Sequence, residues 1–432
     1  MKSSPAQLVL PTLLLCAVAA FGYMMFKPEK RPPIRLGILH SLTGPMATSE
    51  KNAVDAELLA IEEINERGGL LGRRVEGIVA DGASDWPTFS QEAERLIVND
   101  KVDALIGCWT SASRKMVRPV VEKFRHLLIY PMAYEGMEIS PNIIYTGAAP
   151  NQQIIPALKW SLDNLGTKVF IIGSDYVWPR SVNTIIRDQI PALKGHIVGE
   201  EYVTFGSADV DRMIAKIKEA QPDVIMSTLV SDNTNIAFYR KLREAGMTAR
   251  TTPVVSLSVS ETELSIMNPE DIAGHYAAWS YFQSIPRREN QDFLQRFHNR
   301  YGQQRVVSDV MEAAYFSVHL WARSVEQADS AEVSQVNATM LGQSVNAPEG
   351  VITVDSSTRH TWRSFNIGQI RGDGQISIVW SADSPIRPIP YPRTRSRMAW
   401  DDYLDDLYLG WDRQWANPRT DSGVLDNRLM TR

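Results

Sequence analysis

Short runs of consecutive apolar residues alternate with longer amphipathic segments from residue 34 onward. Continuous apolar runs are typical of strands buried on both faces, whereas apolar residues three and four positions apart are typical of helices. The segment 51–67 has the helical spacing and ends at Gly68-Gly69, a common helix stop. In this first series the predicted strands are 34–39, 75–81, 102–108 and 127–132, and the predicted helices are 51–67, 90–100 and 113–125.

A second series of the same kind begins near Asn151. Its predicted helices are 151–165, 180–193, 208–220 and 233–246, and its predicted strands are 168–175, 196–202, 222–230 and 253–259. Alternation of buried strands and helices predicts parallel sheets that are covered by helices on both faces. Two series of this length therefore predict an α/β protein with two doubly wound parallel-sheet lobes.

The remaining segments are predicted to connect and complete the two lobes. Residues 275–282 resemble a crossover strand, and the helices 289–303 and 309–327 are long enough to return to the first lobe. The strands 362–370 and 375–380 flank an Asp-Gly pair and predict a hairpin. The predicted organisation is 34–150 plus 283–345 for lobe 1, 151–282 plus 346–390 for lobe 2, and 391–432 for a linker and a C-terminal amphipathic helix.

The N-terminal 33 residues have the features of a targeting segment. Residues 8–26 are apolar, with Lys2 before them and Lys27, Lys30 and Arg31 after them. This length lies at the border between a signal peptide and a membrane-spanning helix. We expect export, with residues 1–33 as a cleaved signal peptide or as an anchor in the inner membrane, and hence a periplasmic or extracytoplasmic location.

The C-terminal segment carries one apolar helix face that includes Trp400, Leu404, Leu407 and Trp411, with aspartates largely outside it. Such a face predicts a helix packed on its own lobe or, alternatively, a docking helix for a partner. The acidity of the segment disfavours binding to an anionic membrane surface.

Composition excludes several classes of protein. A hydrophobic content of 44% with 22% charged residues and a net charge of −5 indicates a folded protein without nucleic acid as its main partner. Two cysteines, Cys16 and Cys108, form no disulfide framework, and the histidines and cysteines lack the spacing of a zinc site. Glycine-rich nucleotide motifs are also missing, so we expect neither a cofactor nor a metal.

The loops that follow the predicted strands are rich in aromatic and small hydroxyl residues. They read HSLTGP, CWTSAS, YPMAYEG, YTGAAPNQ, GSDYVWPR, LVSDNTN and SLSVSE. Ligands of open parallel sheets bind at the carboxyl ends of the strands, where such loops converge. Few charges occur in these loops, so they predict a cleft for a small neutral polar ligand.

Individual residues in these loops allow more than one role. Cys108 could be a nucleophile, which would make the protein an amide-hydrolysing enzyme, but no activating base is evident and a buried structural thiol is favoured. Glu135 and Asp232 could form an acid/base pair, although capping and ligand hydrogen bonds are commoner roles. Ser113 is predicted to cap the helix that follows, with Ser111 facing the cleft.

Trp109, Tyr130, Tyr176 and Trp178 lie on three different strand-end loops, the last two on the same loop. Each could be simple packing near the hinge. Because four aromatic residues occur at comparable positions, a shared aromatic pocket is the favoured interpretation.

These loops resemble a known family. ILHSLTG, EINERGGLLGRRVE, IGCWTSASRK, YPMAYEG, YTGAAPNQ and GSDYVWPR occur in this order within residues 34–390. They are similar to the periplasmic urea and short-chain amide receptors of ABC importers. These receptors belong to the branched-chain amino-acid receptor group, the type I periplasmic binding proteins.

The resemblance implies two lobes that are joined by three crossings and close on a ligand by a hinge. Trp109 and Tyr130 would form aromatic walls of the first lobe, and Ser111 would hydrogen-bond the ligand. Tyr176 and Trp178 would close from the second lobe. Met132, which replaces a threonine of the related amide sensor, and Asp232 complete the predicted ligand-binding set.

Two departures from the family pattern affect the prediction. Tryptophan in CWTS is the urea-receptor pattern, but Trp178 stands where both subgroups have tyrosine, and the acidic aromatic tail is untypical of plain importer receptors. We expect an exported, non-enzymatic receptor that delivers urea or a short-chain amide to an ABC importer permease. The alternative is an amide-sensing regulatory subunit without a transport role.

Overall fold

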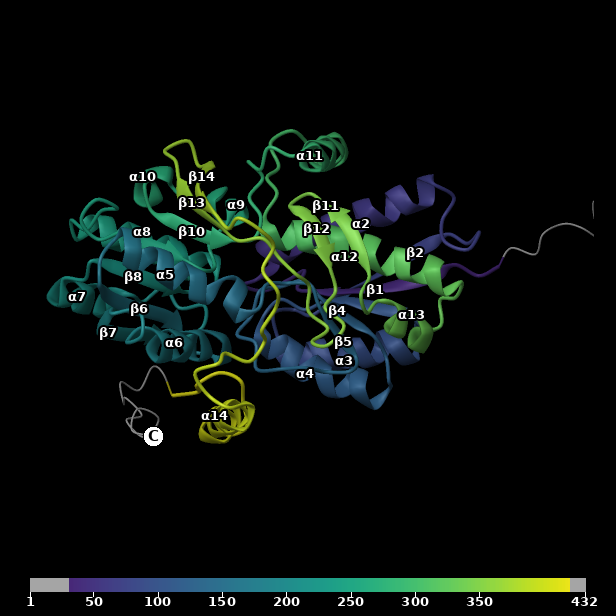
Figure 1. The fold of residues 1–432 in the computed structure, drawn as a ribbon, viewed down its shortest axis with the longest axis horizontal. Coiled ribbons are helices and arrows are strands. Elements are labelled where there is room, and N and C mark those ends of the chain that lie inside the picture. Colours follow the sequence, from purple (N-terminus) through teal and green to yellow (C-terminus); the bar gives the residue numbers. More distant parts are fainter. Residues whose placement is uncertain (1–30, 420–432) are drawn as a thin grey trace, which may run out of the picture.

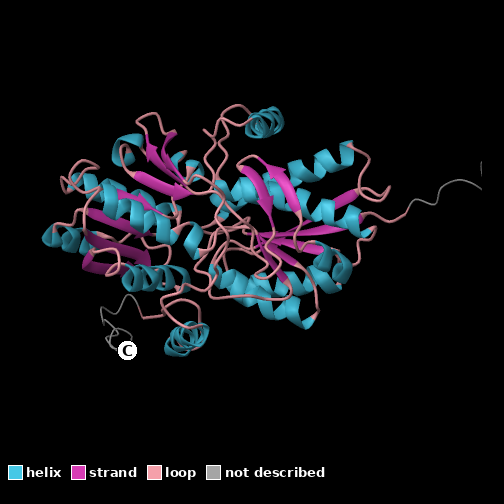
Figure 2. Ribbon diagram, viewed as in Figure 1, coloured by secondary structure: helices cyan, strands magenta, loops and turns pink. Residues whose placement is uncertain are grey.

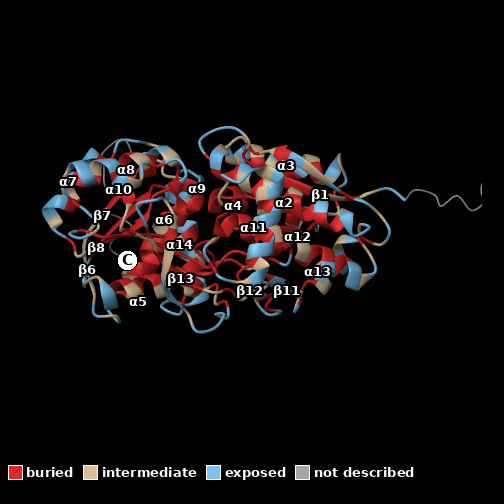
Figure 3. Ribbon diagram, turned by 90° about the horizontal axis from the view of Figure 1, so that it is seen from above, coloured by how far each residue is buried: buried red, intermediate tan, exposed pale blue. Residues whose placement is uncertain are grey.

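The computed structural model describes residues 31–419. Two α/β lobes lie beside one another, and α14 lies below the point where they meet (Figure 1). Each lobe is built around one sheet, with helices outside it (Figure 2). Buried residues are concentrated in the sheets and on the inner faces of the helices (Figure 3).

The sheet of the first lobe has five parallel strands in the order β2-β1-β3-β4-β5. Its strands are short and almost wholly buried in the centre, as the continuous apolar runs predict. The strands are β1 (Ile34–His40), β2 (Val75–Asp81), β3 (Ala104–Gly107), β4 (Leu128–Tyr130) and β5 (Ile143–Tyr145).

Helices cover both faces of this sheet. On one face α2 (Ala47–Glu66) packs beside α12 (Asp309–Ala328), and apolar residues of both helices share a core with β1 and β3. On the other face α3 (Trp86–Val98) packs beside α4 (Ser111–Lys123). Helix α12 is thus one of the segments that return to the first lobe late in the chain. The helices α11 (Arg288–Tyr301) and α13 (Val333–Thr339) accompany it.

The sheet of the second lobe has seven strands in the order β14-β13-β10-β9-β8-β6-β7. The strands β6 to β10 pair in parallel with one another, whereas β13 pairs antiparallel with β10 and forms an antiparallel hairpin with β14 at one edge. The strands are β6 (Lys168–Ser174), β7 (His196–Val203), β8 (Val224–Thr228), β9 (Val254–Ser256), β10 (Tyr276–Trp279), β13 (Asn366–Ile370) and β14 (Ile376–Ser381).

The helices of the second lobe pack in pairs, α5 beside α6 and α7 beside α8. The short helix α10 contacts α8, and α9 contacts α2 of the first lobe. The bounds are η1 (Pro150–Gln152), α5 (Ile154–Asn164), α6 (Val177–Gln189), α7 (Asp211–Ala220), α8 (Asp232–Glu244), α9 (Glu261–Leu264) and α10 (Pro269–Ile272).

The chain passes between the lobes three times, after β5, after β10 and after a hairpin of β11 (Ser344–Ala347) and β12 (Gly350–Thr353). This hairpin packs against α12 of the first lobe, since Ala347 and Ile352 share a small core with Phe316. The α/β class and the two parallel-sheet lobes predicted from the sequence are confirmed. The lobe boundaries given above stay a prediction.

The crossings are held by a buried arginine. Arg363, which follows the third crossing, is fully buried and its guanidinium contacts Asp309, Glu312 and Glu349. Asp309 in turn accepts hydrogen bonds from the amides of the second crossing at Ser280 and Tyr281, at 3.0 and 2.9 Å. A charged group that is buried this deeply requires paired partners, and here the partners come from α12 and from the turn of the β11-β12 hairpin.

The C-terminal segment forms α14 (Arg397–Gly410), which begins at the Ser396 cap. Trp400, Leu404 and Leu407 of its apolar face are buried in the main core. The face that the sequence left open to a partner is therefore covered by the protein itself. Between residues 31 and 419, no helix combines the length and apolarity needed to cross a membrane. The predicted signal peptide or anchor, with residues 8–26, lies outside the described residues.

Candidate functional site

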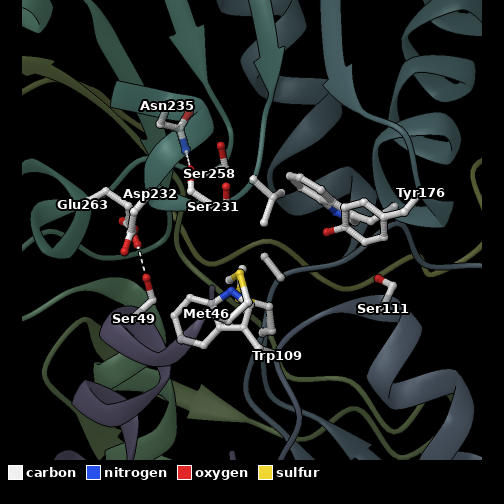
Figure 4. A pocket seen from close by; sticks show the side chains of 14 residues that line it. Met46, Ser49, Trp109, Ser111, Tyr176, Ser231, Asp232, Asn235, Ser258 and Glu263 are labelled. Atoms are coloured by element: carbon white, nitrogen blue, oxygen red, sulfur yellow. Dashed lines mark hydrogen bonds between the residues drawn. The ribbon is translucent and has the colours of Figure 1, made fainter. Parts of the chain in front are cut away.

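A small enclosed cavity lies between the two lobes, at the carboxyl ends of their strands. Its size is about 30 Å³. Figure 4 shows Trp109 and Met46 on one side of it, and Ser231 and Ser258 across from them. The first lobe contributes Met46, Ser49, Trp109, Ser111, Met132 and Ala133; the second contributes Tyr176, Trp178, Val230, Ser231, Asp232, Asn235, Ser258 and Glu263.

Six of the seven residues predicted to bind a ligand line this cavity: Trp109, Ser111, Met132, Tyr176, Trp178 and Asp232. The seventh, Tyr130, lies behind the wall. Its hydroxyl donates to the backbone oxygen of Trp109 at 2.8 Å, and its ring lies beside the Arg114 guanidinium. Burial raises the pKa of Tyr130, so the hydroxyl keeps its proton. In the structure Tyr130 supports Trp109 and is not part of the cavity lining.

A tight turn between β3 and α4 places Trp109. Gly107 and Cys108 both have positive φ, 134° and 64°, and the Cys108 amide donates to the Leu39 oxygen of β1 at 2.9 Å. A Cβ on Gly107 would lie 2.1 Å from that same oxygen, so only glycine fits here. The turn brings the indole of Trp109 out of the sheet and into the gap between the lobes.

The predicted cap of α4 is wrong. Thr110, not Ser113, is the N-cap residue, and its hydroxyl accepts from the Ser113 amide at 3.0 Å. The helix begins at Ser111, two residues earlier than the apolar periodicity indicates. Ser113 lies within the first turn, and its hydroxyl donates to the Thr110 oxygen at 2.8 Å.

Behind Ser111 lies a buried ionic network. The Ser111 hydroxyl donates to Glu135 and accepts from the Arg114 guanidinium at 3.2 Å. Arg114 also donates to Glu138 at 2.9 Å and to Glu135 at 3.1 Å, and all three charged side chains are buried. Burial alone would raise the pKa of Glu138, but Arg114 and the neighbouring Lys115 lower it to about 2. This network fixes the hydroxyl that faces the cavity.

On the second lobe, Tyr176 and Trp178 lie at the start of α6. Besides Trp178, Tyr176 contacts Trp86 of the first lobe at 6.3 Å and Phe205 at 5.3 Å between ring centroids. Trp178 is only 4% exposed, and its Nε1 has no hydrogen-bond partner. A buried donor without a partner costs free energy unless something in the cavity accepts from it.

The first turn of α8 supplies two further polar groups. Ser231 caps this helix with a positive φ of 86°, and Asp232 and Asn235 of its first turn line the cavity (Figure 4). Asn235 donates through its amide nitrogen to the Ser231 oxygen at 3.2 Å, whereas its Oδ1 has no partner. Burial raises the pKa of Asp232, and a hydrogen bond with Thr48 opposes this effect.

A direct hydrogen bond between the lobes lies beside the cavity. The Ser49 hydroxyl on α2 donates to Glu263 on α9 at 2.9 Å, as drawn in Figure 4. The other oxygen of Glu263 accepts from the amide and hydroxyl of Ser260, which caps α9. The structure is therefore a closed form in which both lobes contribute to one enclosed space.

The nucleophile and acid/base alternatives find no support in the geometry. Cys108 is fully buried outside the cavity lining, and burial raises the pKa of its thiol. Glu135 is bonded to Arg114 and Ser111 and does not line the cavity, in contrast to Asp232.

Sequence reasoning missed Asn235, Ser49, Glu263 and Trp86. Asn235 lies three residues after Asp232 and so on the same helix face, a spacing that could have revealed it. Ser260 and Glu263 have the capping-box spacing that marks a helix start. The local sequence around Ser49 and Trp86 carries no comparable signal, because their contacts form only when the lobes meet.

Comparison with known proteins identifies the family. A model of the periplasmic binding protein domain matches residues 34–397. The chain belongs to this family, and membership implies an extracytoplasmic location. The family consists of binding proteins, and solved structures with the same fold include solute-binding proteins of ABC transporters with small molecules bound.

Two relatives and one solved structure illustrate the range. The Leu/Ile/Val-binding protein BraC3 of Rhizobium johnstonii is 23% identical over 370 residues, 83% of this chain and 97% of that protein. A protein named limonene hydroxylase in Geobacillus stearothermophilus is 36% identical over 124 residues, 29% of this chain but only 23% of that protein. A solute-binding protein of an ABC transporter from Rhodopseudomonas palustris, crystallised with 3,4-dihydroxybenzoic acid, has a TM-score of 0.74 at 22% identity and covers 82% of this chain and 99% of its own.

Proposed function

We propose that this protein is an exported receptor that encloses urea or a short-chain primary amide between its lobes and delivers it to an ABC importer. Trp109, Ser111, Met132, Tyr176, Trp178 and Asp232 contact the ligand, and Asn235 joins them. Tyr130 acts indirectly, through Trp109. Residues 8–26 guide export or anchor the receptor to the inner membrane.

The size of the cavity is the observation that carries the proposal. One water molecule needs about 10–15 Å³ of such space. The cavity, at about 30 Å³, therefore has room for about two or three waters, which is the scale of urea or acetamide. Leucine or a dihydroxybenzoate, which similar proteins bind, is larger than this space and would require the lining side chains to move.

The polar groups in the cavity match an amide. The Trp178 Nε1 donor requires an acceptor, which the carbonyl oxygen of the ligand supplies. The Asn235 Oδ1 acceptor requires a donor and the Asp232 carboxylate can accept further hydrogen bonds, both of which the N–H groups of the ligand supply. A planar molecule with one oxygen and several N–H groups satisfies all three, and the aromatic rings of Trp109 and Tyr176 offer flat contact surfaces.

Charge favours a neutral ligand over an acid. The cavity lining of the described chain contains two carboxylates, Asp232 and Glu263, and no lysine or arginine. Burial raises the pKa of both carboxyl groups, and a bound carboxylate would add a further negative charge without a counterion.

Isothermal titration calorimetry tests the proposal with urea, formamide, acetamide, leucine and benzoate as ligands. We expect binding of urea or an amide and no measurable binding of leucine or benzoate. Binding of leucine or benzoate alone would overturn the proposal, and so would the absence of binding by urea and all amides. Guanidinium serves as a further probe, since it has the planar shape of urea but no acceptor for Trp178.

The alternative, an amide-sensing subunit, relied on a tail helix that is free to dock on a partner. In the structure, the apolar face of α14 is buried against the protein itself. This arrangement favours the importer receptor. Capture of a permease and an ATPase by the tagged receptor from detergent-solubilised membranes would support the importer role, whereas a soluble regulator in their place would support the alternative.

A further inference from the structure

The segment from Pro390 to Asn417 contacts both lobes although it belongs to neither sheet. Its beginning is fixed to the first lobe, where the Met137 amide donates to the Pro390 oxygen at 2.8 Å. Gly136 permits this approach, because its φ is 73° and a Cβ there would lie 2.0 Å from the same oxygen.

The end of the segment is fixed to the second lobe. The Val177 amide donates to the Trp415 oxygen at 2.9 Å, and the Asn417 amide donates to the Asp175 oxygen at 3.1 Å. Tyr176 and Ala416 form an antiparallel bridge between these bonds. The Asn417 side chain adds a bond to the Asp175 carboxylate at 2.8 Å. Residues 415–417, which we call the clamp, thus hold the backbone that carries Tyr176 and Trp178 into the cavity.

Between its two ends, the segment packs on α6. Tyr403 accepts a hydrogen bond from Thr184 at 3.0 Å, and Arg395 pairs with Asp188 at 2.6 Å. The Trp400 indole is fully buried and donates to the Pro392 oxygen at 2.8 Å. These contacts fix α14 on the second lobe independently of the clamp.

The clamp also touches the first lobe. The Lys115 ammonium lies 4.8 Å from the centre of the Trp415 ring. Lys115 is buried, and its ammonium lies 3.8 Å from Glu135, the carboxylate that holds Ser111. We call the cavity lining of the first lobe the first wall and that of the second lobe the second wall. A chain of contacts therefore runs from Ser111 in the first wall, through Glu135 and Lys115, to Trp415, which fixes the second wall.

We propose that the clamp positions the second-lobe wall of the cavity and holds it against the first lobe, so that ligand affinity depends on a segment outside both lobes. This inference rests on the proposed function only for the identity of the ligand. The clamp supplies the backbone bonds that orient Tyr176 and Trp178, and it makes its Lys115 contact in the closed form.

The test compares two truncations of the full chain. One ends after Gln414 and removes the clamp, whereas the matched control ends after Arg419 and keeps it. Hydrogen exchange without ligand should show the amides of residues 176–178 exchanging about tenfold faster in the first truncation, and calorimetry should show affinity for urea or acetamide weakened about tenfold. The control should behave as the intact protein.

Asn417→Ala is the second variant, in case the shorter chain folds poorly. It removes one side-chain bond to Asp175 and should weaken affinity about threefold. Unchanged exchange at residues 176–178 in the clamp truncation would overturn the inference, as would faster exchange with unchanged affinity. If the intact protein binds neither urea nor any amide, the proposed function fails. The exchange experiment then still tests whether the clamp holds the backbone of residues 176–178.

Discussion

The two walls of the cavity are supported in different ways. Behind the first wall, Ser111 is bonded to Arg114 and Glu135, and Tyr130 supports Trp109 from the core. In the second wall, Trp178 and Asn235 each keep one buried polar atom without a partner, while no such atom occurs among the first-lobe residues that line the described cavity. We infer that the first wall provides a fixed shape and that the second provides the hydrogen bonds that the ligand completes.

The largest expected effect tests the support of the first wall. Arg114→Met leaves Glu135 and Glu138 buried without their main counterion and should destabilise the protein by about 3–5 kcal/mol. Thermal unfolding measures this, since urea is a proposed ligand and guanidinium has its planar shape, so that either denaturant would complicate a titration. Arg118→Met is the control, because Arg118 contacts Glu138 but its side chain is 40% exposed, and the cost should stay below about 1 kcal/mol. Equal losses in the two variants would show that the network does not support the wall.

The two lobes should also differ in their dependence on pH. Glu138, behind the first wall, has its pKa lowered from 4.5 to about 2. Its contribution to the stability of the protein is therefore complete above pH 4.5 and disappears as pH falls through 2. Glu261 on α9 is the opposite case. Burial raises its pKa to about 8, with the Gln283 amide opposing this effect, so the folded protein loses stability as pH rises from 4.5 to 8.

Glu261→Gln removes that loss. The variant should be more stable than the wild type by on the order of 1–3 kcal/mol at pH 8 and should match it near pH 4. Thermal unfolding across this range measures the difference. A constant difference between the two proteins at all pH values would contradict the assignment of the titration to Glu261.

Trp178→Phe tests the polar role of the second wall. The change removes the Nε1 donor but keeps an aromatic ring, so affinity for urea or acetamide should fall about tenfold, or about 1.4 kcal/mol. Stability should fall only through the lost packing of the larger ring, because the Nε1 donor has no partner in the ligand-free protein. Trp160→Phe, at a residue that packs on Tyr276 away from the cavity, is the control and should leave calorimetric affinity unchanged. A tenfold loss in both variants would exclude a specific hydrogen bond.

The smallest effect is expected at Cys108. It is buried behind the cavity, and Cys108→Ala should cost about 1 kcal/mol of stability through lost packing. Affinity should be unchanged, and neither protein should release ammonia from urea or acetamide. Ammonia release by the wild type that the variant lacks would restore the enzymatic alternative.

The length of an element decided whether the sequence could predict it. Continuous strands such as 168–174 and the helix around 54–64 were predictable, because burial imposes a period that is visible in the chain. The three-residue strand β5 and the hairpin of β11 and β12 were not recognised, since so few residues show no period.

The site was predictable where the residues occupy strand-end loops, as Trp109 and Tyr176 do. Tyr130 is outside the cavity lining because β4 extends as far as Tyr130 itself, which the sequence pattern does not reveal. Ser49 and Trp86 were missed because they reach the other lobe across the interface. Asn235 could be predicted as a cavity residue only if the start of α8 were known, and the Ser231 cap determines that start.

The most direct test of the central claim is the NMR signal of the Trp178 indole N–H. Comparison of the wild type with Trp178→Phe assigns this signal among those of the 11 tryptophans. Addition of urea or acetamide should shift it downfield, as expected when a free donor gains a carbonyl acceptor, while the Trp160 indole signal stays in place. Saturating ligand that leaves the Trp178 signal unmoved would contradict the claim that the second wall supplies the hydrogen bonds of the site.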